Sequence, residues 1–200
     1  MAFFIATGSI SNDVVRKETR NGVLTTFRLE TGASRGRKLW IDIECWGHLA
    51  GTIAHHGKSR RSINVSGRLT QKSWRDSASG EARQRIVVTA HDIDLISESD
   101  DTAQLLAPNS VLLRGTVESV LPARAVRSGT VSCIRVAEGR AGSKTGRLVL
   151  QVEHWTATGA TNVQLASRRP VAALGSLTLG AGTSTACAGA VLDARTLAAT

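Results

Sequence analysis

The sequence predicts an all-β protein built from two similar halves. Apolar and polar residues alternate through many short segments, such as FFIATGSI and KLWIDIECW, and this alternation is typical of strands with one buried face. Asn, Gly and charged turn residues separate the segments. The order of segments in the first half of the chain recurs in the second half, so the chain is interpreted as an internal duplication.

The first half contains five expected strands and one short helix. The helix is expected in GHLAGTIAHHG, where Leu49, Ile53 and His56 would form its apolar side. Three strands, a helix and two further strands is the order of the OB-fold, a five-stranded Greek-key barrel that binds oligonucleotides. The expected strands are Phe3–Ile10, Gly22–Thr31, Leu39–Trp46, Ser62–Gln71 and Gln84–Ile96.

The second half repeats this order around matching anchor residues. VLLRGTV corresponds to FIATGSI, RLVLQVEHW to KLWIDIECW, and SRRPVAALGSLTL to KSRRSINVSGRLTQ. The sequence therefore predicts two tandem OB-folds. The anchors pair as Gly8 with Gly115, Trp46 with Trp155, and Gly67 with Gly175.

The two copies are not expected to be functional equals. Residues 1–98 are expected to form the N-terminal OB-fold and main binding domain, residues 99–109 a linker, and residues 110–200 a degenerate C-terminal copy. In that copy Val149 occupies the place of Trp40. Trp155 remains, and it is either a base contact or an interface or core residue.

The hairpin before the last strand also differs between the copies. Gly175 and Asp193 are 18 residues apart, whereas Gly67 and Asp94 are 27 residues apart. With Asp193 taken as the equivalent of Asp94, the hairpin that holds Trp74 in the first copy is cut down to GAGTSTACAG in the second, and no aromatic residue remains there. The first copy is therefore expected to do most of the binding.

Composition favours an intracellular protein with a polyanionic partner. The chain has 200 residues and a net charge of +9, and such a positive balance favours nucleic acid or an anionic membrane surface. Its three cysteines are far apart in mostly apolar segments, as expected of core thiols in a reducing compartment. No signal peptide, membrane span or zinc-ligand spacing is recognised, so the chain is expected to be cytoplasmic and nucleoid-associated, with no metal or other cofactor.

The aromatic residues favour nucleic acid over a membrane. Trp40 and Trp46 lie on one face of an alternating strand, and Asp42 and Glu44 between them require that face to be in contact with water. These carboxylates are expected to pair with Arg28 or Arg68 on neighbouring strands.

Trp74 lies in the basic, turn-rich stretch LTQKSWRDSASGEARQR, and large aromatic side chains beside Lys and Arg suit bases and phosphates. The strand and this stretch together form a candidate binding site. The residues expected to bind are Trp40, Trp46, Trp74, Arg28, Arg35, Arg37, Lys38, Lys58, Arg60, Arg61, Arg68, Lys72, Arg75, Arg85 and Trp155.

The first half of the chain resembles the bacterial-type single-stranded DNA-binding proteins. The resemblance rests on Gly8 in the opening strand, the Asn21-Gly22 turn, KLWIDIECWGHLAG, GKSRRSINVSGRLTQKSWRDSASGEARQRIVV and the closing AHDIDLIS. It implies an OB-fold whose base-stacking positions are Trp40, Trp46 and Trp74, with no catalysis and no cofactor. It also implies an assembly of about four OB-folds, which for two copies per chain means a homodimer.

Two features depart from the family pattern. Its bacterial members usually end in an acidic, hydrophobic tip that recruits other enzymes, whereas this sequence ends VLDARTLAAT, so recruitment by that route is not expected. Asp42 and Glu44 also lie where a groove that follows phosphates would prefer neutral or basic groups.

The expected function is to coat and protect single-stranded DNA, without sequence specificity, during replication, recombination or repair. RNA remains an alternative ligand, because stacking platforms accept either sugar. A second alternative is an OB-type protein-interaction module whose tryptophans are interface anchors. Catalysis is not expected, because no GxSxG, HExxH or P-loop motif lies in a suitable context.

Overall fold

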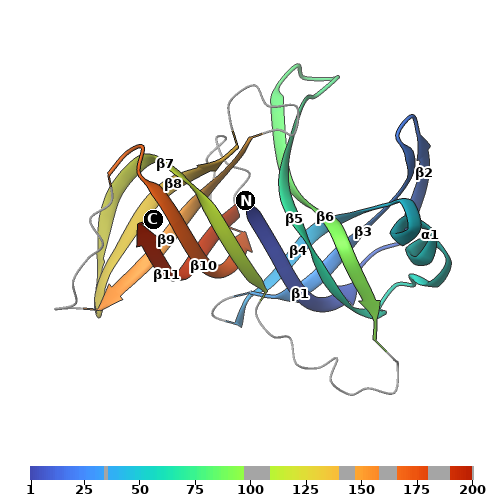
Figure 1. The fold of residues 1–200 in the computed structure, drawn as a ribbon, viewed down its shortest axis with the longest axis horizontal. Helices are drawn as coiled ribbons and strands as arrows, with labels where there is room; N and C mark the ends of the chain where they lie inside the picture. Colours follow the sequence, from blue (N-terminus) through green and yellow to red (C-terminus); the bar gives the residue numbers. More distant parts are fainter. Residues whose placement is uncertain (34–35, 97–108, 140–146, 158–165, 180–189, 200) are drawn as a thin grey trace. The chain divides into compact units, whose positions relative to one another are not determined.

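The computed structural model describes residues 1–33, 36–96, 109–139, 147–157, 166–179 and 190–199 (Figure 1). Close contacts divide the chain into two compact units. The N-terminal unit consists of Phe3–Thr70 and Ile86–Asn109, and the C-terminal unit consists of Met1–Ala2, Gln71–Arg85 and Ser110–Thr200.

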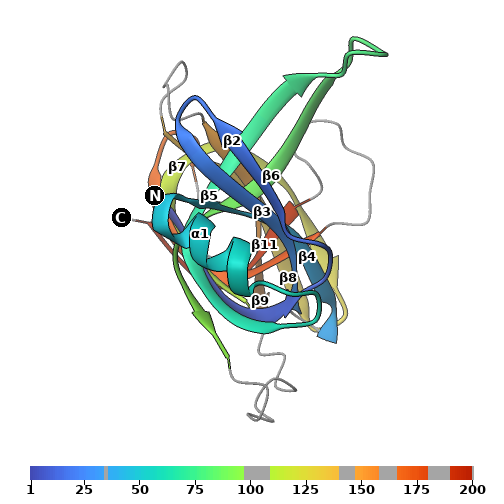
Figure 2. The same ribbon diagram turned by 90° about the vertical axis from the view of Figure 1, so that its right-hand side faces the viewer.

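Six strands and one helix are described between residues 2 and 96: β1 (Ala2–Ile10), β2 (Val15–Thr19), β3 (Gly22–Gly32), β4 (Lys38–Trp46), α1 (Gly47–His56), β5 (Ser62–Arg75) and β6 (Ala82–Leu95). Five of these strands close into a barrel (Figures 1 and 2). β1 pairs antiparallel with β3 and β5, β3 pairs antiparallel with β4, and β4 runs parallel to β6, the neighbour of β5. With α1 between β4 and β5, this is the OB-fold order.

The C-terminal unit contains a second barrel of the same order. Its strands are β7 (Ser110–Val126), β8 (Gly129–Glu138), β9 (Leu148–Ala157), β10 (Pro170–Leu179) and β11 (Ala190–Ala199). β7 pairs antiparallel with β8 and β10, β8 with β9, and β10 with β11, while β9 runs parallel to β11. The prediction of an all-β protein with two tandem OB-folds is therefore confirmed.

The first pair of anchor glycines marks the same close strand contact in both barrels. A Cβ atom at Gly8 would collide with the backbone carbonyl oxygen of Glu30 on β3, and one at Gly115 would collide with that of Ala137 on β8. Because the colliding atoms belong to the backbone of the neighbouring strand, a side chain at either position would push two strands apart. The match seen in the sequence therefore has a steric cause.

The second pair of glycines corrects one step of the sequence comparison. A Cβ atom at Gly67 would collide with the carbonyl oxygen of Thr89, and one at Gly175 would collide with that of Asp193. Asp193 thus takes the place of Thr89, and its predicted equivalence to Asp94 is wrong. Gly67 and Thr89 are 22 residues apart and Gly175 and Asp193 are 18 residues apart, so the sequence between these anchors is four residues shorter in the second copy, and not nine. The segment GAGTSTACAG, residues 180–189, lies outside the described residues.

The buried face of β4 is the one that its alternation predicts. Burial, together with the smaller effect of the neighbouring carboxylate of Glu44, raises the pKa of the Cys45 thiol to about 12, so this cysteine is an unreactive part of the core. Cys133 is half-buried and its pKa is also raised by burial, while Cys187 lies outside the described residues. The core residues of β4 are Leu39, Ile41, Ile43 and Cys45, each no more than 4% exposed.

Glu44 was expected on a face in contact with water, and that prediction is wrong, since its side chain is only 4% exposed. β4 is an inner strand at this point. Glu44 lies opposite Thr26 on β3 and opposite Thr89 on β6, so strands flank it on both sides. The alternation of apolar and polar residues in β4 predicted on which face of the strand Glu44 lies. It did not predict how far β3 and β6 would bury the Glu44 side chain.

β2 is additional to the five strands expected in this half. All five of its residues, VRKET, are exposed, and it pairs with β3, so no alternation of burial marks it in the sequence. The predicted helix is present as α1, with Ala50 and Ile53 buried and Leu49 half-buried. His55 and His56 are exposed at its end, so the placement of His56 on the apolar side is wrong.

Most of the expected linker, residues 99–108, lies outside the described residues. Within the part of the chain that the structure describes, no helix has the length and apolar character needed to cross a membrane.

Candidate nucleic-acid interface

Trp40 presents an open indole on the outer face of β4. Its side chain is 45% exposed, and it lies directly opposite Glu30 on β3. Hydrogen bonds from Lys38 and from the Trp40 indole N–H hold the pKa of Glu30 below its usual range, the bond from Lys38 having the larger effect. The indole of Trp40 is thus accessible for stacking beside a paired carboxylate.

Trp46 occupies a more enclosed position than Trp40. It lies opposite Leu24 on β3, it is half-buried, and it is the N-cap residue of α1. Both tryptophans therefore lie on the predicted face, but Trp40 is the more accessible one.

The cations beside Trp40 are already paired with carboxylates. Arg28 Nε lies 3.0 Å from Asp42 Oδ1, which confirms the predicted pairing of this carboxylate, and Lys38 pairs with Glu30. Both cations remain about half exposed, so they can approach a phosphate. The paired carboxylates reduce the positive potential that they would otherwise supply.

A second group of cations lies in the turn between α1 and β5. The backbone N–H of Arg60 donates to the Ile10 carbonyl at 2.7 Å, and the N–H of Ile10 donates to the Arg61 carbonyl at 3.0 Å, which ties this turn to the end of β1. Lys58 and Arg60 are exposed, and Arg61 is half-buried.

Three further arginines were predicted to belong to the binding site, and the structure does not place them in either group of cations. Arg68 on β5 is half-buried and Arg37 is exposed before β4, whereas Arg35 lies outside the described residues. The structure thus groups Arg28, Lys38 and Trp40 on adjoining strands, and it groups Lys58, Arg60 and Arg61 in one turn.

The hairpin formed by Gln71–Arg85, here called the basic hairpin, carries the third tryptophan. Trp74 is 45% exposed, and the guanidinium carbon of Arg85 lies 5.7 Å from the centroid of its ring, within the range of a cation–π contact. Side chains alternate along a strand, so Lys72 lies on the same face as Trp74. Lys72, Arg75 and Arg85 are all exposed. One face of this hairpin therefore combines an aromatic ring with cations, as base and phosphate binding require.

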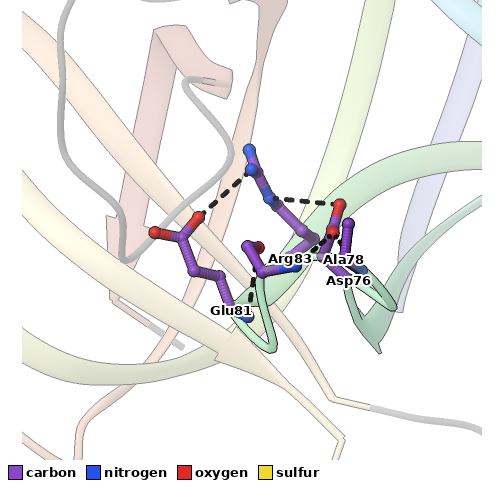
Figure 3. A network of polar contacts seen from close by, with 5 residues as sticks. Asp76, Ala78, Glu81 and Arg83 are labelled. Atoms are coloured by element: carbon purple, nitrogen blue, oxygen red, sulfur yellow. Dashed lines mark hydrogen bonds and ion pairs between the residues drawn. The ribbon is translucent and has the colours of Figure 1, made fainter.

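A polar network closes the tip of the basic hairpin, as Figure 3 shows. Asp76 Oδ1 accepts hydrogen bonds from the backbone N–H groups of Ser79 and Ala78, each at 3.0 Å, and these bonds lower the pKa of Asp76. The guanidinium of Arg83 lies 3.1 Å from Glu81 and 4.0 Å from Asp76. Arg83 is thus engaged in holding the turn.

The corresponding face of the C-terminal unit has a different set of side chains. Trp155 on β9 is 45% exposed and lies opposite Val131, much as Trp46 lies opposite Leu24. At the place of Trp40, Val149 lies opposite Ala137.

Arg135 on β8 is a candidate that sequence reasoning missed. It lies opposite Gln151 on β9, in the place where Arg28 lies opposite Asp42. Its Nε atom is buried and has no hydrogen-bond partner among the residues that the structure describes. The sequence signal was available, because Arg135 follows Gly115 at the distance at which Arg28 follows Gly8.

Across the described ranges, no group of three His, Cys, Asp or Glu side chains is arranged to hold a metal ion. His91, Asp92 and Asp94 on β6 are exposed strand residues.

The first half of the chain is similar to a known protein family. Residues 1–96 match the model of the single-strand binding protein family. This part of the chain is similar to that family. The matched residues include Trp40, Trp46, Trp74 and the basic hairpin. All binding candidates of the N-terminal copy therefore lie within the matched part of the chain.

Two curated relatives from this family are similar to the chain. Single-stranded DNA-binding protein 1 of Chlorobaculum tepidum is 28% identical over 102 residues, which are 46% of this chain and 63% of the relative. Single-stranded DNA-binding protein 2 of Nostoc sp. is 30% identical over 73 residues, which are 36% of this chain and 58% of the relative. The chain thus spans less than two thirds of either relative.

A solved structure extends the likeness to the second copy. The wild-type single-stranded DNA binding protein from Thermus aquaticus is similar over 100% of this chain and 93% of its own, with a TM-score of 0.74 and 16% sequence identity. At this identity the likeness concerns the fold, and it includes both barrels.

Proposed function

We propose that this protein binds single-stranded DNA without sequence preference and coats it during replication, recombination or repair. The observation that carries the proposal is the open indole of Trp40, which is 45% exposed and lies opposite Glu30 on the outer face of an OB-fold barrel. The two curated relatives and the Thermus aquaticus structure, all single-stranded DNA-binding proteins by name, support the same ligand.

Binding would combine stacking with counterion release, and no step of it involves catalysis. Bases would stack on Trp40 and Trp74, each worth about 1–3 kcal/mol, with Trp46 and Trp155 as further contacts. Every base has a π-face, so little sequence preference follows. Affinity should fall by about 0.7 log units per log unit of salt for each phosphate neutralised.

The finer organisation is also part of the proposal. Residues 1–98 would act as the main binding domain, residues 99–109 as a linker and residues 110–200 as the second copy. Two chains would form a homodimer with four OB-folds, in the cytoplasm and associated with the nucleoid. RNA is a second possible ligand, since the exposed indoles accept bases of either nucleic acid.

Tryptophan fluorescence tests the proposal directly. The wild-type protein and the Trp40→Ala/Trp74→Ala variant would be titrated with oligo-dT of increasing length at low and high salt, and with oligo-U in parallel. We expect deep quenching that saturates at a length-dependent stoichiometry, weakens with salt and largely disappears in the double variant. Absence of quenching by either oligonucleotide at low salt would favour the protein-interaction module instead.

A further inference from the structure

The basic hairpin has two chemically different faces. Alternation places Gln71 on the face opposite to Lys72 and Trp74. Gln71 Nε2 donates a hydrogen bond to Gln84 Oε1 at 2.6 Å, while Arg85 packs over the ring of Trp74. One face therefore carries a pair of bonded glutamines, and the other carries the tryptophan with its cations.

The glutamine face is attached to a strand of the second OB-fold. Gln71 Oε1 accepts a hydrogen bond from the backbone N–H of Val149 on β9 at 3.0 Å. Both residues belong to the C-terminal unit, together with the rest of the basic hairpin. Gln71 thus uses both ends of its amide, one toward the partner strand of the hairpin and one toward β9.

We propose that Gln71 and Gln84 are positioning residues that anchor the basic hairpin to β9 and so hold the Trp74 face ready to stack on single-stranded DNA. This inference rests on the proposed function. An isolated two-stranded hairpin is marginally stable in water, and ordering it during binding would weaken the affinity. An anchor that exists before DNA arrives removes that cost.

The anchor would give the second copy a role that its own side chains do not reveal. Val149 replaces the tryptophan of the first copy, but its backbone N–H is available whatever the side chain is. The second copy would then contribute to binding by fixing an aromatic residue that belongs, in sequence, to the first copy.

The test uses the full-length chain with Gln71→Leu, which keeps the size of the side chain and removes both hydrogen bonds. We expect the affinity for oligo-dT to fall about fivefold, the lower end of the contribution of one stacked base. Ser73→Ala is the matched control, since Ser73 lies on the same hairpin face by alternation, and it should bind as the wild type does. The salt dependence should not change, because no charge is removed.

A double-mutant cycle separates positioning from general damage to the fold. In a Trp74→Ala background, Gln71→Leu should have no further effect, because the residue that it positions is already gone. An equal loss of affinity in both backgrounds, or wild-type affinity for Gln71→Leu, would overturn the inference. Gln84→Leu offers a second variant, which leaves the bond to Val149 in place and should cause a smaller loss.

Amide hydrogen exchange measures the anchor without DNA. The Val149 N–H should exchange faster in Gln71→Leu than in the wild type, and unchanged exchange would contradict the anchor. If the wild-type protein fails to bind oligo-dT, the proposed function fails, yet the exchange measurement still decides whether the hairpin is anchored.

Discussion

The outer faces of β3–β4 and β8–β9 have the same backbone register and different chemistry. Arg28 opposite Asp42 becomes Arg135 opposite Gln151, so a neutralised cation in the first copy corresponds to a cation opposite a neutral amide in the second. Trp40 opposite Glu30 in the first copy corresponds to Val149 opposite Ala137 in the second, which is a small apolar pair. The first face thus offers an aromatic platform with balanced charges, and the second offers a positive charge with fewer aromatics.

This difference shows which features the duplicated fold constrains. The anchor glycines occur in both copies because a Cβ atom at any of them would collide with a backbone oxygen. The outward-facing residues are free of that requirement, so they can differ without disturbing the barrel. The second copy lacks a tryptophan at the place of Trp40 but keeps an arginine at the place of Arg28.

The largest expected effects concern the shared framework. Gly8→Ala and Gly115→Ala should each destabilise the protein by about 3 kcal/mol, since the new Cβ must displace a neighbouring strand. Urea unfolding followed by circular dichroism measures the loss. Gly51→Ala is the control: nothing lies within 4 Å of a Cβ there, and in α1 the change should be neutral or slightly stabilising. A tolerated Gly115→Ala beside a damaging Gly8→Ala would break the equivalence of the two barrels.

The next effect distinguishes the aromatic platforms. Trp40→Ala should weaken oligo-dT binding by about 2 kcal/mol, roughly 30-fold, because one stacked base is lost. Trp155→Ala should cost less, about 1 kcal/mol, since its face lacks a second tryptophan at the place of Trp40. Val149→Ala should leave affinity unchanged. Fluorescence anisotropy of labelled oligo-dT gives all three values, and equal losses for Trp40 and Trp155 would show that the copies bind alike.

A smaller effect distinguishes the two arginines. Arg135→Gln should lower the slope of log affinity against log salt by about 0.7, the value for one phosphate contact to a single strand. Arg28→Gln should lower it less, because Asp42 already neutralises this cation. Asp42→Asn serves as the companion variant, and it should make Arg28 behave as Arg135 does. Identical slopes for Arg28→Gln and Arg135→Gln would mean that the ion pair does not matter to binding.

The sequence predicted the fold well because strands and glycine contacts leave local signals. Alternation identified the buried face of β4, and the repeated glycines identified the duplication. β2 was missed because all its residues are exposed. The predicted equivalence of Asp94 and Asp193 is wrong because two aspartates near a strand end look alike when the pairing of strands is unknown.

The types of residue in the candidate site could be predicted from the sequence. The contacts that those residues make with other strands could not. Exposed tryptophans beside cations were apparent in the sequence, and the structure leaves Trp40 and Trp74 open. The bond from Val149 to Gln71 could not be predicted, because it joins positions that are distant in sequence through a backbone donor that carries no residue-specific signal. Glu44 was misplaced for a related reason, since its burial depends on two neighbouring strands at once.

The smallest expected effect is a pH dependence that belongs to the first copy. Lys38 and Trp40 lower the pKa of Glu30 from its usual value near 4.5, so the ionised carboxylate stabilises the folded state. That contribution is complete above the unfolded pKa and is lost as the pH falls through the lower, folded pKa. Lys38 is half exposed, so the contribution should stay below about 1 kcal/mol.

Glu30→Gln tests this contribution by urea unfolding at several pH values. The variant should be less stable than the wild type at pH 7, and the difference should disappear as the pH falls well below 4.5. A difference that stays constant with pH would assign the effect to packing. Ala137 occupies the equivalent place in the second copy, so Ala137→Ser, which adds no charge, should show no such trend. A pH-dependent loss confined to Glu30 would locate the electrostatic support of the stacking platform in the first barrel.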